Sequence, residues 1–387
     1  MGNLIGQKRL KTSVGWAARV ALLYLIVIAL VPPPPRALLG AAHTVETEKP
    51  HVCVHTRLID EVDEWKIAQS LQYVREMGAS TIVEFFPWAY VESSPDQYNW
   101  ASVDRILCHV QNQGLRVIAR IGFVPDWARS TDQEHTSTLN TLTPEFYADF
   151  AEFAADFAAR YAGVIDHFII WNEPNLAFEW GFQAVDPLNY VELLRTVYPA
   201  VKRANPDAVI LAAPLAPTLE PRGSPNGLND LLYLEALYQN GAANYFDALA
   251  IHTYGFTHAA DDPPAADVLN FRRAELLRAI MIRYGDEDTP AYITETGWND
   301  SPRWTNAVSP SQRIAETIRA FELAEEWDWL TSMCVWVFRI PAPTFNYPDY
   351  FTLVNVDFQR KPIYYALRAY ARGFAQSEML WLPPPAE

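Results

Sequence analysis

Cysteine is scarce in this chain, and the few residues that occur are far apart. Cys53, Cys108 and Cys334 are the three cysteines among 387 residues. Zinc and iron–sulfur sites need several ligands at short, regular spacings, and small disulfide-rich domains need more cysteines. The spacing therefore excludes both kinds of structure. We expect buried free thiols, and a Cys53–Cys334 disulfide is the alternative if the first and last strands are neighbours.

Positive charge is also sparse. The chain has 30 lysines and arginines against 46 aspartates and glutamates, a net charge of −16. Beyond the N-terminus there is no basic stripe of the kind that neutralises phosphates, so we expect no nucleic-acid partner. No glycine-rich phosphate turn and no cluster of metal-ligand residues is visible. We therefore expect neither a metal nor an organic cofactor.

The chain has only one apolar run near its start, and that run is short. Lysines and arginines at positions 8, 9, 11 and 19 precede Val20–Val31, Pro32–Pro35 ends the run, and small residues follow at 40–42. This order is typical of a secretory signal. A membrane span needs about 20 apolar residues. We expect a cleaved signal, with membrane attachment through residues 16–31 as the alternative. Either puts the folded part outside the cytoplasm, extracellular or membrane-anchored.

From His51 onward, apolar strand-like segments alternate with helical patterns. The eight segments are 52–58, 80–86, 116–123, 167–173, 208–214, 246–255, 290–298 and 331–339. Continuous apolar strands indicate a parallel sheet covered by helices. Eight strand–helix units are the number that closes a (β/α)₈ TIM barrel. We predict one such α/β domain over residues 51–376, after an N-terminal segment 1–50 and before a disordered proline-rich tail 377–387. A doubly wound open sheet is the alternative.

Helix signals support this division. Thr143-Pro144, Asp186-Pro187 and Ser309-Pro310 each place a capping side chain before a proline at the first helical position. Phe146, Phe150, Phe153 and Phe157 recur at helical spacing, which predicts a stripe that faces the core.

Polar and aromatic side chains gather where the predicted strands end. In a TIM barrel these carboxyl ends form the active face. The residues there, taken strand by strand, are His55 and Arg57, Trp88, Trp127, Asn172 and Glu173, His252 and Tyr254, Glu295 and Trp298, and Trp336.

Two of these residues are carboxylates at matching positions. Glu173 ends the fourth strand and Glu295 the seventh, so in a closed barrel they face one another across the mouth. Two facing carboxyls are the chemical groups of glycoside hydrolysis. One is protonated and donates to the leaving oxygen, while the other is ionised and attacks the anomeric carbon, because their surroundings hold their pKa values apart.

The motifs around these carboxylates resemble those of a known group of enzymes. "WNEPN" (171–175) and "ITETGW" (293–298) look like the strand ends of glycoside hydrolase clan A. The sequence is most similar to family thirty-nine, which is β-xylosidase-like, and family five, which is cellulase-like. "VPDWA" (124–128) and "HTYG" (252–255) also resemble their counterparts there. The resemblance covers about residues 52–372 and implies a retaining β-glycosidase acting on a polysaccharide or oligosaccharide.

The resemblance also implies roles for individual residues. Glu173 would be the acid/base and Glu295 the nucleophile. Asn172 would bind the sugar 2-hydroxyl, and Tyr254 would hydrogen-bond Glu295. His252 and Trp336 would line the sugar subsite. Further candidates for sugar contacts are Trp88, Trp127, Trp180 and Trp298.

The sequence departs from the clan pattern at the second strand. Clan members commonly carry an arginine there that supports the nucleophile, but this chain has Val83 and Glu84. Arg57 and Arg120 are the candidate substitutes, with His55 as a further supporting residue. Glu84 either pairs with one of these arginines or enters the pocket as a third carboxylate.

Three alternatives to a retaining glycosidase stay open. They are a non-catalytic carbohydrate-binding barrel, a transglycosylase acting on cell-surface glycans, and a barrel enzyme of another reaction class.

Overall fold

The computed structural model describes residues 19, 40–129 and 138–374. The chain divides into two units, Met1–Ala41 and Ala42–Glu387. The predicted signal or anchor at 16–31, apart from Arg19, and the tail at 377–387 lie outside the described residues. Among the described residues, no helix is long and apolar enough to cross a membrane.

The second unit begins before the predicted domain start at His51. The backbone N–H of His43 donates to the Asn112 carbonyl at 2.7 Å, and that of Glu48 donates to the Ala371 carbonyl at 2.8 Å. Residues 42–50 are therefore part of the same unit as the strands and helices that follow.

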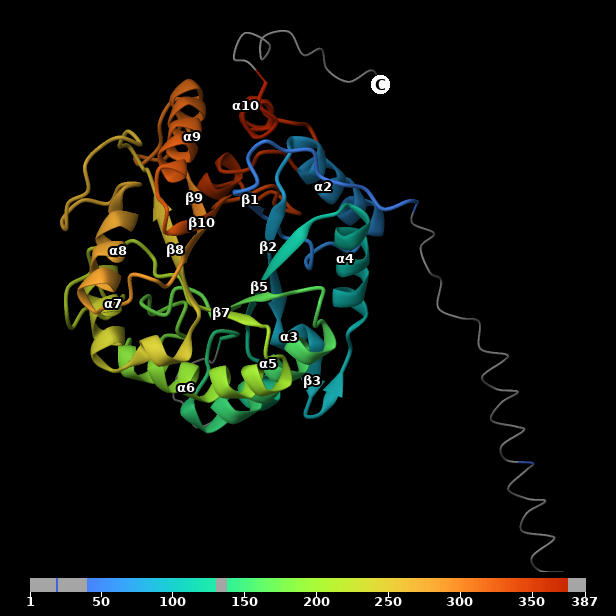
Figure 1. The fold of residues 1–387 in the computed structure, drawn as a ribbon, viewed down its shortest axis with the longest axis vertical. Helices are drawn as coiled ribbons and strands as arrows, with labels where there is room; N and C mark the ends of the chain where they lie inside the picture. The colour runs from blue at the N-terminus through green and yellow to red at the C-terminus, as the bar shows by residue number, and fades with distance from the viewer. Residues whose placement is uncertain (1–18, 20–39, 130–137, 375–387) are drawn as a thin grey trace, which may run out of the picture. The chain divides into compact units, whose positions relative to one another are not determined.

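Eight parallel strands form a closed barrel in the order β1-β10-β9-β8-β7-β6-β5-β2 (Figure 1). The strands are β1 (Val52–His55), β2 (Thr81–Pro87), β5 (Arg116–Gly122), β6 (His167–Ile170), β7 (Val209–Ala212), β8 (Ala248–Tyr254), β9 (Ala291–Gly297) and β10 (Leu330–Val335). Because β1 pairs with both β2 and β10, the sheet has no open edge. The predicted (β/α)₈ barrel is confirmed, and the open doubly wound sheet is excluded.

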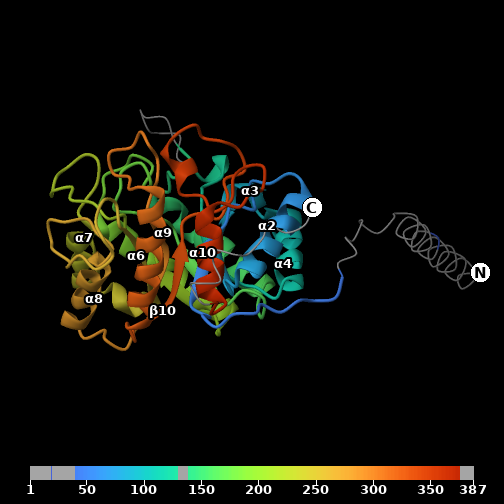
Figure 2. The same cartoon turned by 90° about the horizontal axis from the view of Figure 1, so that it is seen from above.

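Helices cover the outside of the barrel (Figures 1 and 2). They are α2 (Glu64–Met77), α4 (Ala101–Asn112), α5 (Tyr147–Arg160), α6 (Pro187–Ala204), α7 (Asp230–Gln239), α8 (Arg273–Arg283), α9 (Pro310–Glu325) and α10 (Pro362–Ala371). A short helix α3 (Trp88–Val91) and a hairpin of β3 (Glu92–Ser94) and β4 (Gln97–Tyr98) follow β2. These short elements were not predicted, because they span too few residues to show a period.

Two of the three predicted helix caps form. The Asp186 carboxylate accepts from the Leu188 N–H at 2.9 Å, and Ser309 forms a capping box with Gln312. Thr143 makes no such bond, because a 3₁₀ turn (Pro144–Phe146) precedes α5. Three of the four predicted phenylalanines face the core from α5, since Phe150, Phe153 and Phe157 are fully buried. The fourth, Phe146, lies in the 3₁₀ turn and packs against the core partly buried.

One layer of buried side chains, which we call the lower layer, receives a residue from every strand of the barrel. Its members are Cys53, Val83, Ile118, Ile169, Leu211, Ala248, Ala250, Tyr292 and Cys334. Side chains alternate between the two faces of a strand, so the residue two positions later also points inward, nearer the carboxyl end. These next residues, which we call the upper layer, include His55, Phe85, Arg120, Trp171, His252 and Trp336. The barrel interior is therefore mostly apolar in the lower layer and polar or aromatic in the upper layer, nearer the carboxyl ends of the strands.

Glu295 reaches this upper layer because of an irregularity in β9. Tyr292 belongs to the lower layer, so regular alternation would point Thr294 inward. The register with β8 skips Thr294 instead, passing from Ile251↔Ile293 to His252↔Glu295. The register with β10 also gains one β9 residue in this stretch, passing from Met333↔Ile293 to Val335↔Thr296. An extra residue of this kind is a β-bulge, which re-aims the side chains that follow it. The bulge aligns Glu295 with His252.

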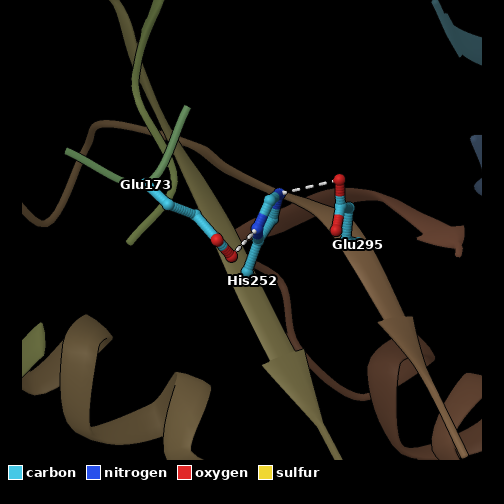
Figure 3. Close-up of side chains that lie close together, drawn as sticks. All are labelled: Glu173, His252 and Glu295. Atoms are coloured by element: carbon cyan, nitrogen blue, oxygen red, sulfur yellow. Dashed lines mark hydrogen bonds and ion pairs between the residues drawn. The ribbon is translucent and has the colours of Figure 1, made fainter. Parts of the chain in front are cut away.

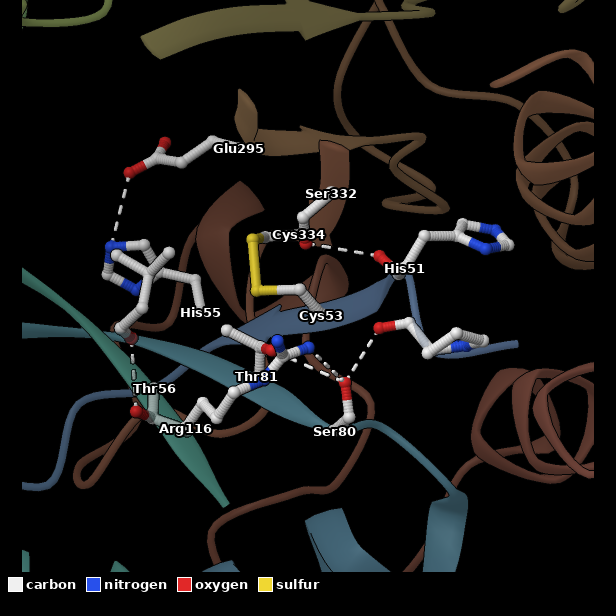
Figure 4. The surroundings of a disulfide bond; sticks show 12 residues. His51, Cys53, His55, Thr56, Ser80, Thr81, Arg116, Glu295, Ser332 and Cys334 are labelled. Atoms are coloured by element: carbon white, nitrogen blue, oxygen red, sulfur yellow. Dashed lines mark hydrogen bonds and ion pairs between the residues drawn. A yellow bond between two sulfur atoms is a disulfide. The ribbon is translucent and has the colours of Figure 1, made fainter. Parts of the chain in front are cut away.

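The expectation of free thiols at Cys53 and Cys334 is wrong. The two residues are partners in the β1–β10 register, their Cα atoms are 4.1 Å apart, and they form a disulfide (Figure 4). The sequence indicated that these strands are neighbours but not which residues stand opposite each other. Cys108 is a free, exposed cysteine.

We expect the Cys53→Ala/Cys334→Ala double variant to lose about 2–5 kcal/mol of unfolding free energy. The disulfide joins residues separated by 281 positions, so it restricts the unfolded chain strongly. Urea unfolding with and without dithiothreitol measures the loss. Cys108→Ala is the matched control and should behave as wild type. Equal midpoints for the double variant and wild type would show that the bond contributes nothing.

Candidate active site

A cavity of about 630 Å³ lies at the carboxyl ends of the strands. Eight of the side chains singled out from the sequence line it: His55, Arg57, Arg120, Asn172, Glu173, Tyr254, Glu295 and Trp336. Most come from the upper layer or from the first loop residues after a strand. The period of the strands and the closure of the barrel together gather them in one place.

Glu173 and Glu295 lie close together with His252 between them (Figure 3). Nδ1 of His252 is 2.7 Å from Oε1 of Glu173, and its Nε2 is 3.7 Å from Oε1 of Glu295. One atom of each of the three side chains lies within 4.8 Å of the others. His252 is 2% exposed and does not line the cavity, so it lies between the carboxylates rather than on the predicted subsite wall.

Glu295 is buried and has several polar neighbours. The Tyr254 hydroxyl donates to its Oε2 at 2.7 Å, as the resemblance implied. Nη1 of Arg120 is 3.5 Å from Oε1, and Nε2 of His55 is 3.4 Å from the same atom (Figure 4). Burial raises the pKa of Glu295, while His252 and Arg120 oppose that rise. These contacts favour the ionised form, which burial alone would disfavour.

Glu173 has fewer compensating partners. Burial raises its pKa to about 7, and Arg120 opposes the rise.

The backbone just after β6 has unusual geometry, with φ of 78° at Trp171 and 40° at Glu173. Such angles cost on the order of 1–3 kcal/mol and persist where the surroundings impose them. The Glu173 N–H donates to the Pro214 carbonyl at 3.0 Å, which ties this turn to the segment that follows β7.

Arg120, from β5, is the arginine that faces Glu295. Its Nη1 also donates to Oδ1 of Asn172 at 2.7 Å, and its guanidinium lies over the Phe85 ring, 4.6 Å from the centroid. Arg57 lines the cavity but pairs with Asp60 at 2.6 Å. Of the two predicted substitutes, the structure brings Arg120 to Glu295.

Both expectations for Glu84 are wrong. Its buried carboxylate accepts from the backbone N–H groups of Leu58 and Ile59, at 2.9 and 3.0 Å, and from the Thr56 hydroxyl. It neither lines the cavity nor forms an ion pair with Arg57 or Arg120. Glu84 instead holds the loop that follows β1.

The third carboxylate of the cavity is Glu179, which sequence reasoning missed. It hydrogen-bonds the Asn172 side chain, and its Oε2 accepts from Nδ2 of Asn140 at 3.4 Å. Burial and the Glu173 charge raise its pKa to about 7. Asn172 is therefore held between Arg120 and Glu179. Glu179 lies in an irregular loop, where no period indicates the direction of a side chain.

The four tryptophans proposed as further sugar contacts do not line the cavity. Trp88, Trp180 and Trp298 are at most 1% exposed. Nε1 of Trp88 donates to Glu92, and that of Trp298 donates to the His258 carbonyl. Trp127 donates to the Glu92 carbonyl and packs against Trp88. These rings are packing residues in this structure. Trp171 and Trp304, which were not predicted, line the cavity instead.

The geometry is compatible with two chemistries. Glu173, His252 and Glu295 could each give one ligand atom to a metal ion. The same two carboxylates, one with a raised pKa and one with hydrogen-bond and cationic support, could also act as an acid and a nucleophile.

The fold resembles that of solved glycoside hydrolases. A family 39 glycoside hydrolase from the gut symbiont Bacteroides cellulosilyticus WH2 superposes with a TM-score of 0.66 at 20% identity, over 86% of this chain and 65% of that one. A monomeric β-xylosidase from Caulobacter crescentus CB15 gives 0.61 at 18%, over 86% and 69%. An exo-β-1,4-mannosidase from Opitutaceae bacterium strain TAV5 gives 0.56 at 18%, over 89% and 63%.

This chain spans just under two thirds of the first of these structures. No family model matches the sequence, and no curated protein does. The structural likeness agrees with the resemblance to clan A. At sequence identities of 18–20%, it shows a shared fold.

We expect Arg120→Met to raise the pKa of both Glu173 and Glu295, because the guanidinium charge lowers both. Arg57→Met is the matched control: it removes a cavity-lining arginine that faces neither carboxylate. The pKa values can be read from ¹³C NMR of protein labelled at the glutamate carboxyl carbon. Each signal is assigned by its loss in the Glu173→Gln or Glu295→Gln variant. If the two pKa values rose in Arg57→Met and not in Arg120→Met, Arg120 would not be the cation that lowers them.

Proposed function

We propose that this protein is a retaining glycoside hydrolase that cleaves β-O-glycosidic bonds of polysaccharides or oligosaccharides. One observation carries the proposal: Glu173 and Glu295, from the ends of β6 and β9, present oxygens within 4.8 Å of one another in a cavity. Retaining glycosidases hold their two carboxyl groups about 5–5.5 Å apart, whereas inverting ones leave room for a water. The short separation supports retention.

The reaction would run in two displacements. Glu295 attacks the anomeric carbon while Glu173 gives its proton to the glycosidic oxygen, so the aglycone leaves as an alcohol and a glycosyl ester forms on Glu295. Glu173, now ionised, takes a proton from water, and the resulting hydroxide attacks the anomeric carbon. The ester bond breaks, the sugar leaves with its original configuration, and both carboxyls return to their starting states.

His252 can keep the two carboxyls in opposite protonation states. Burial lowers its pKa to about 4, so at neutral pH the ring is uncharged and carries one proton. If that proton is on Nε2, it points toward the ionised Glu295, and Nδ1 accepts the proton of Glu173 at 2.7 Å. The opposite tautomer would place a lone pair toward Glu295. The first arrangement matches the acid and nucleophile roles.

The remaining cavity residues would bind the sugar. Asn172, fixed by Arg120 and Glu179, would donate to the 2-hydroxyl. Trp336 lines the cavity and would contact the ring. The structural neighbours include a β-xylosidase and an exo-β-1,4-mannosidase, so β-xylosides and β-mannosides are the first substrates to test.

A panel of aryl β-glycosides tests the activity, and 2-fluoro glycosides test the mechanism. We expect a stable sugar adduct on the peptide that contains Glu295, detected by mass mapping. Glu295→Ala should lose at least about 10³-fold in kcat, since the covalent step disappears. Glu152→Gln, an exposed change on α5, is the control. Turnover without any adduct, or with inversion, would overturn the mechanism.

The same panel separates the alternatives. Binding without turnover would identify a non-catalytic sugar-binding barrel. Sugar-to-sugar transfer as the main reaction would identify a transglycosylase. Activity that EDTA abolishes and Zn²⁺ restores would identify a metal enzyme at the same three residues.

The pKa of Glu173 predicts the alkaline limb of the pH profile. The acid must be protonated to act, so kcat/KM should fall as pH rises through about 7. Glu173→Gln cannot lose a proton there, so its residual activity toward a good leaving group should show no such fall. Initial rates between pH 4 and 9 measure both. A fall that survives in Glu173→Gln would assign the limb to another group.

We also propose that the barrel acts outside the cytoplasm. The Cys53–Cys334 disulfide supports this location, since such bonds persist in oxidising compartments. Thiol alkylation of protein recovered from its native cell tests it. Two alkylated thiols at these positions in the freshly isolated protein would contradict the proposal.

A further inference from the structure

A second cavity of about 510 Å³ adjoins the first. It is built from the loop after β9 and the long segment between β10 and α10. Trp304 and Tyr347 line both cavities, so the two spaces share a wall. The rings of these two residues are stacked, with centroids 4.7 Å apart and planes 18° from parallel. The two cavities are therefore neighbours on the carboxyl-end side of the barrel, with this pair of rings common to both.

Aromatic side chains are exposed around the second cavity. Phe345 is 90% exposed, Tyr347 39% and Tyr350 37%, and all three line it. Single exposed apolar residues need no explanation. Several on one hollow beside a candidate active site are typical of a binding surface. Contacts within the chain therefore leave a large part of each of these three rings exposed.

The turn that carries Phe345 is held in place by hydrogen bonds. The Asp349 carboxylate accepts from the N–H groups of Thr344 and Phe345, at 2.9 and 2.8 Å. It also accepts from the Thr344 hydroxyl at 2.9 Å. Phe345 has a φ of 58°, an angle that is costly for a bulky residue. The chain therefore keeps a phenylalanine in solvent on a fixed turn.

Polar groups complete the lining. Nζ of Lys361 donates to the Asp349 carbonyl and to the Thr352 hydroxyl, both at 2.7 Å. An ammonium has three protons, so these two bonds leave one for a ligand. Asn346 and Asn355 also line the cavity. Aromatic faces beside a few hydrogen-bonding groups match a pyranose, which has apolar C–H faces and a rim of hydroxyls.

We propose that this second cavity is a subsite for a further pyranose residue of the substrate. The enzyme would then act on oligosaccharides that span both cavities, with Phe345 and Tyr350 stacking on a sugar away from the cleaved bond. This inference rests on the proposed glycosidase activity and names the length of substrate that the site accepts.

The test compares substrates of different length. Aryl β-xyloside and β-mannoside occupy the first cavity, while β-1,4-linked xylo- and manno-oligosaccharides of two to five residues can reach the second. For wild type, kcat/KM should rise with chain length until both cavities are filled. Phe345→Ala should lower kcat/KM for the longest substrate about three- to tenfold relative to its effect on the aryl glycoside, the size of one aromatic contact.

Phe182→Ala is the matched control. Phe182 is also an exposed phenylalanine, 65% accessible with a φ of 59°, and it lines neither cavity. It should leave the dependence on chain length unchanged. Thermal melting of both variants checks that the turns still fold.

The outcomes separate the subsite from the activity on which it rests. Turnover of the aryl glycosides with no gain from longer substrates would overturn the subsite and leave the glycosidase standing. Equal losses on short and long substrates in Phe345→Ala would also overturn it. If no glycoside of any length is cleaved, the proposed function fails and the subsite fails with it.

Discussion

The two-residue period of a strand, imposed on a closed barrel, is the constraint on which the site depends. It sends every second side chain inward, so the residues above the apolar lower layer must meet at the centre. Glu295 joins them only because the bulge at Thr294 adds one residue to β9. Without that extra residue, the same strand would turn the carboxylate toward the helices. The candidate chemistry therefore depends on a local break in an otherwise regular period.

Electrostatics then distinguishes residues that the fold has brought together. Burial raises the pKa of Glu173, Glu179 and Glu295 alike. What differs is the set of neighbours: Glu295 has the Tyr254 hydroxyl and faces Arg120, His55 and His252. One guanidinium touches Glu295 and Asn172 and lowers the pKa of Glu173 and Glu179 as well. Arg120 thus favours the ionised form of Glu173, Glu179 and Glu295 and also holds the Asn172 amide in place.

The sequence was informative where a period or a motif repeated, and silent where the chain was irregular. Eight apolar segments were enough to predict the barrel, and two strand-end motifs were enough to place Glu173 and Glu295 in one cavity. Register was not predictable, which is why free thiols were expected at Cys53 and Cys334 and the disulfide was only the alternative. Glu179 was missed because loop direction is set by tertiary contacts such as those with Asn140 and Asn172. Several tryptophans were wrongly expected to contact sugar, since an indole near a barrel mouth can equally fill the space beneath the loops.

The pairing of β1 with β10 has a consequence for how the protein is made. The first strand to leave the ribosome has its final partner 281 residues later, at Cys334. Until then, β1 offers one unpaired edge, and such edges pair readily with other chains. Closing so long a loop is also the most costly contact of the barrel in chain entropy. Once β10 arrives, the covalent bond makes the seam permanent, and the barrel can no longer open between its first and last strands.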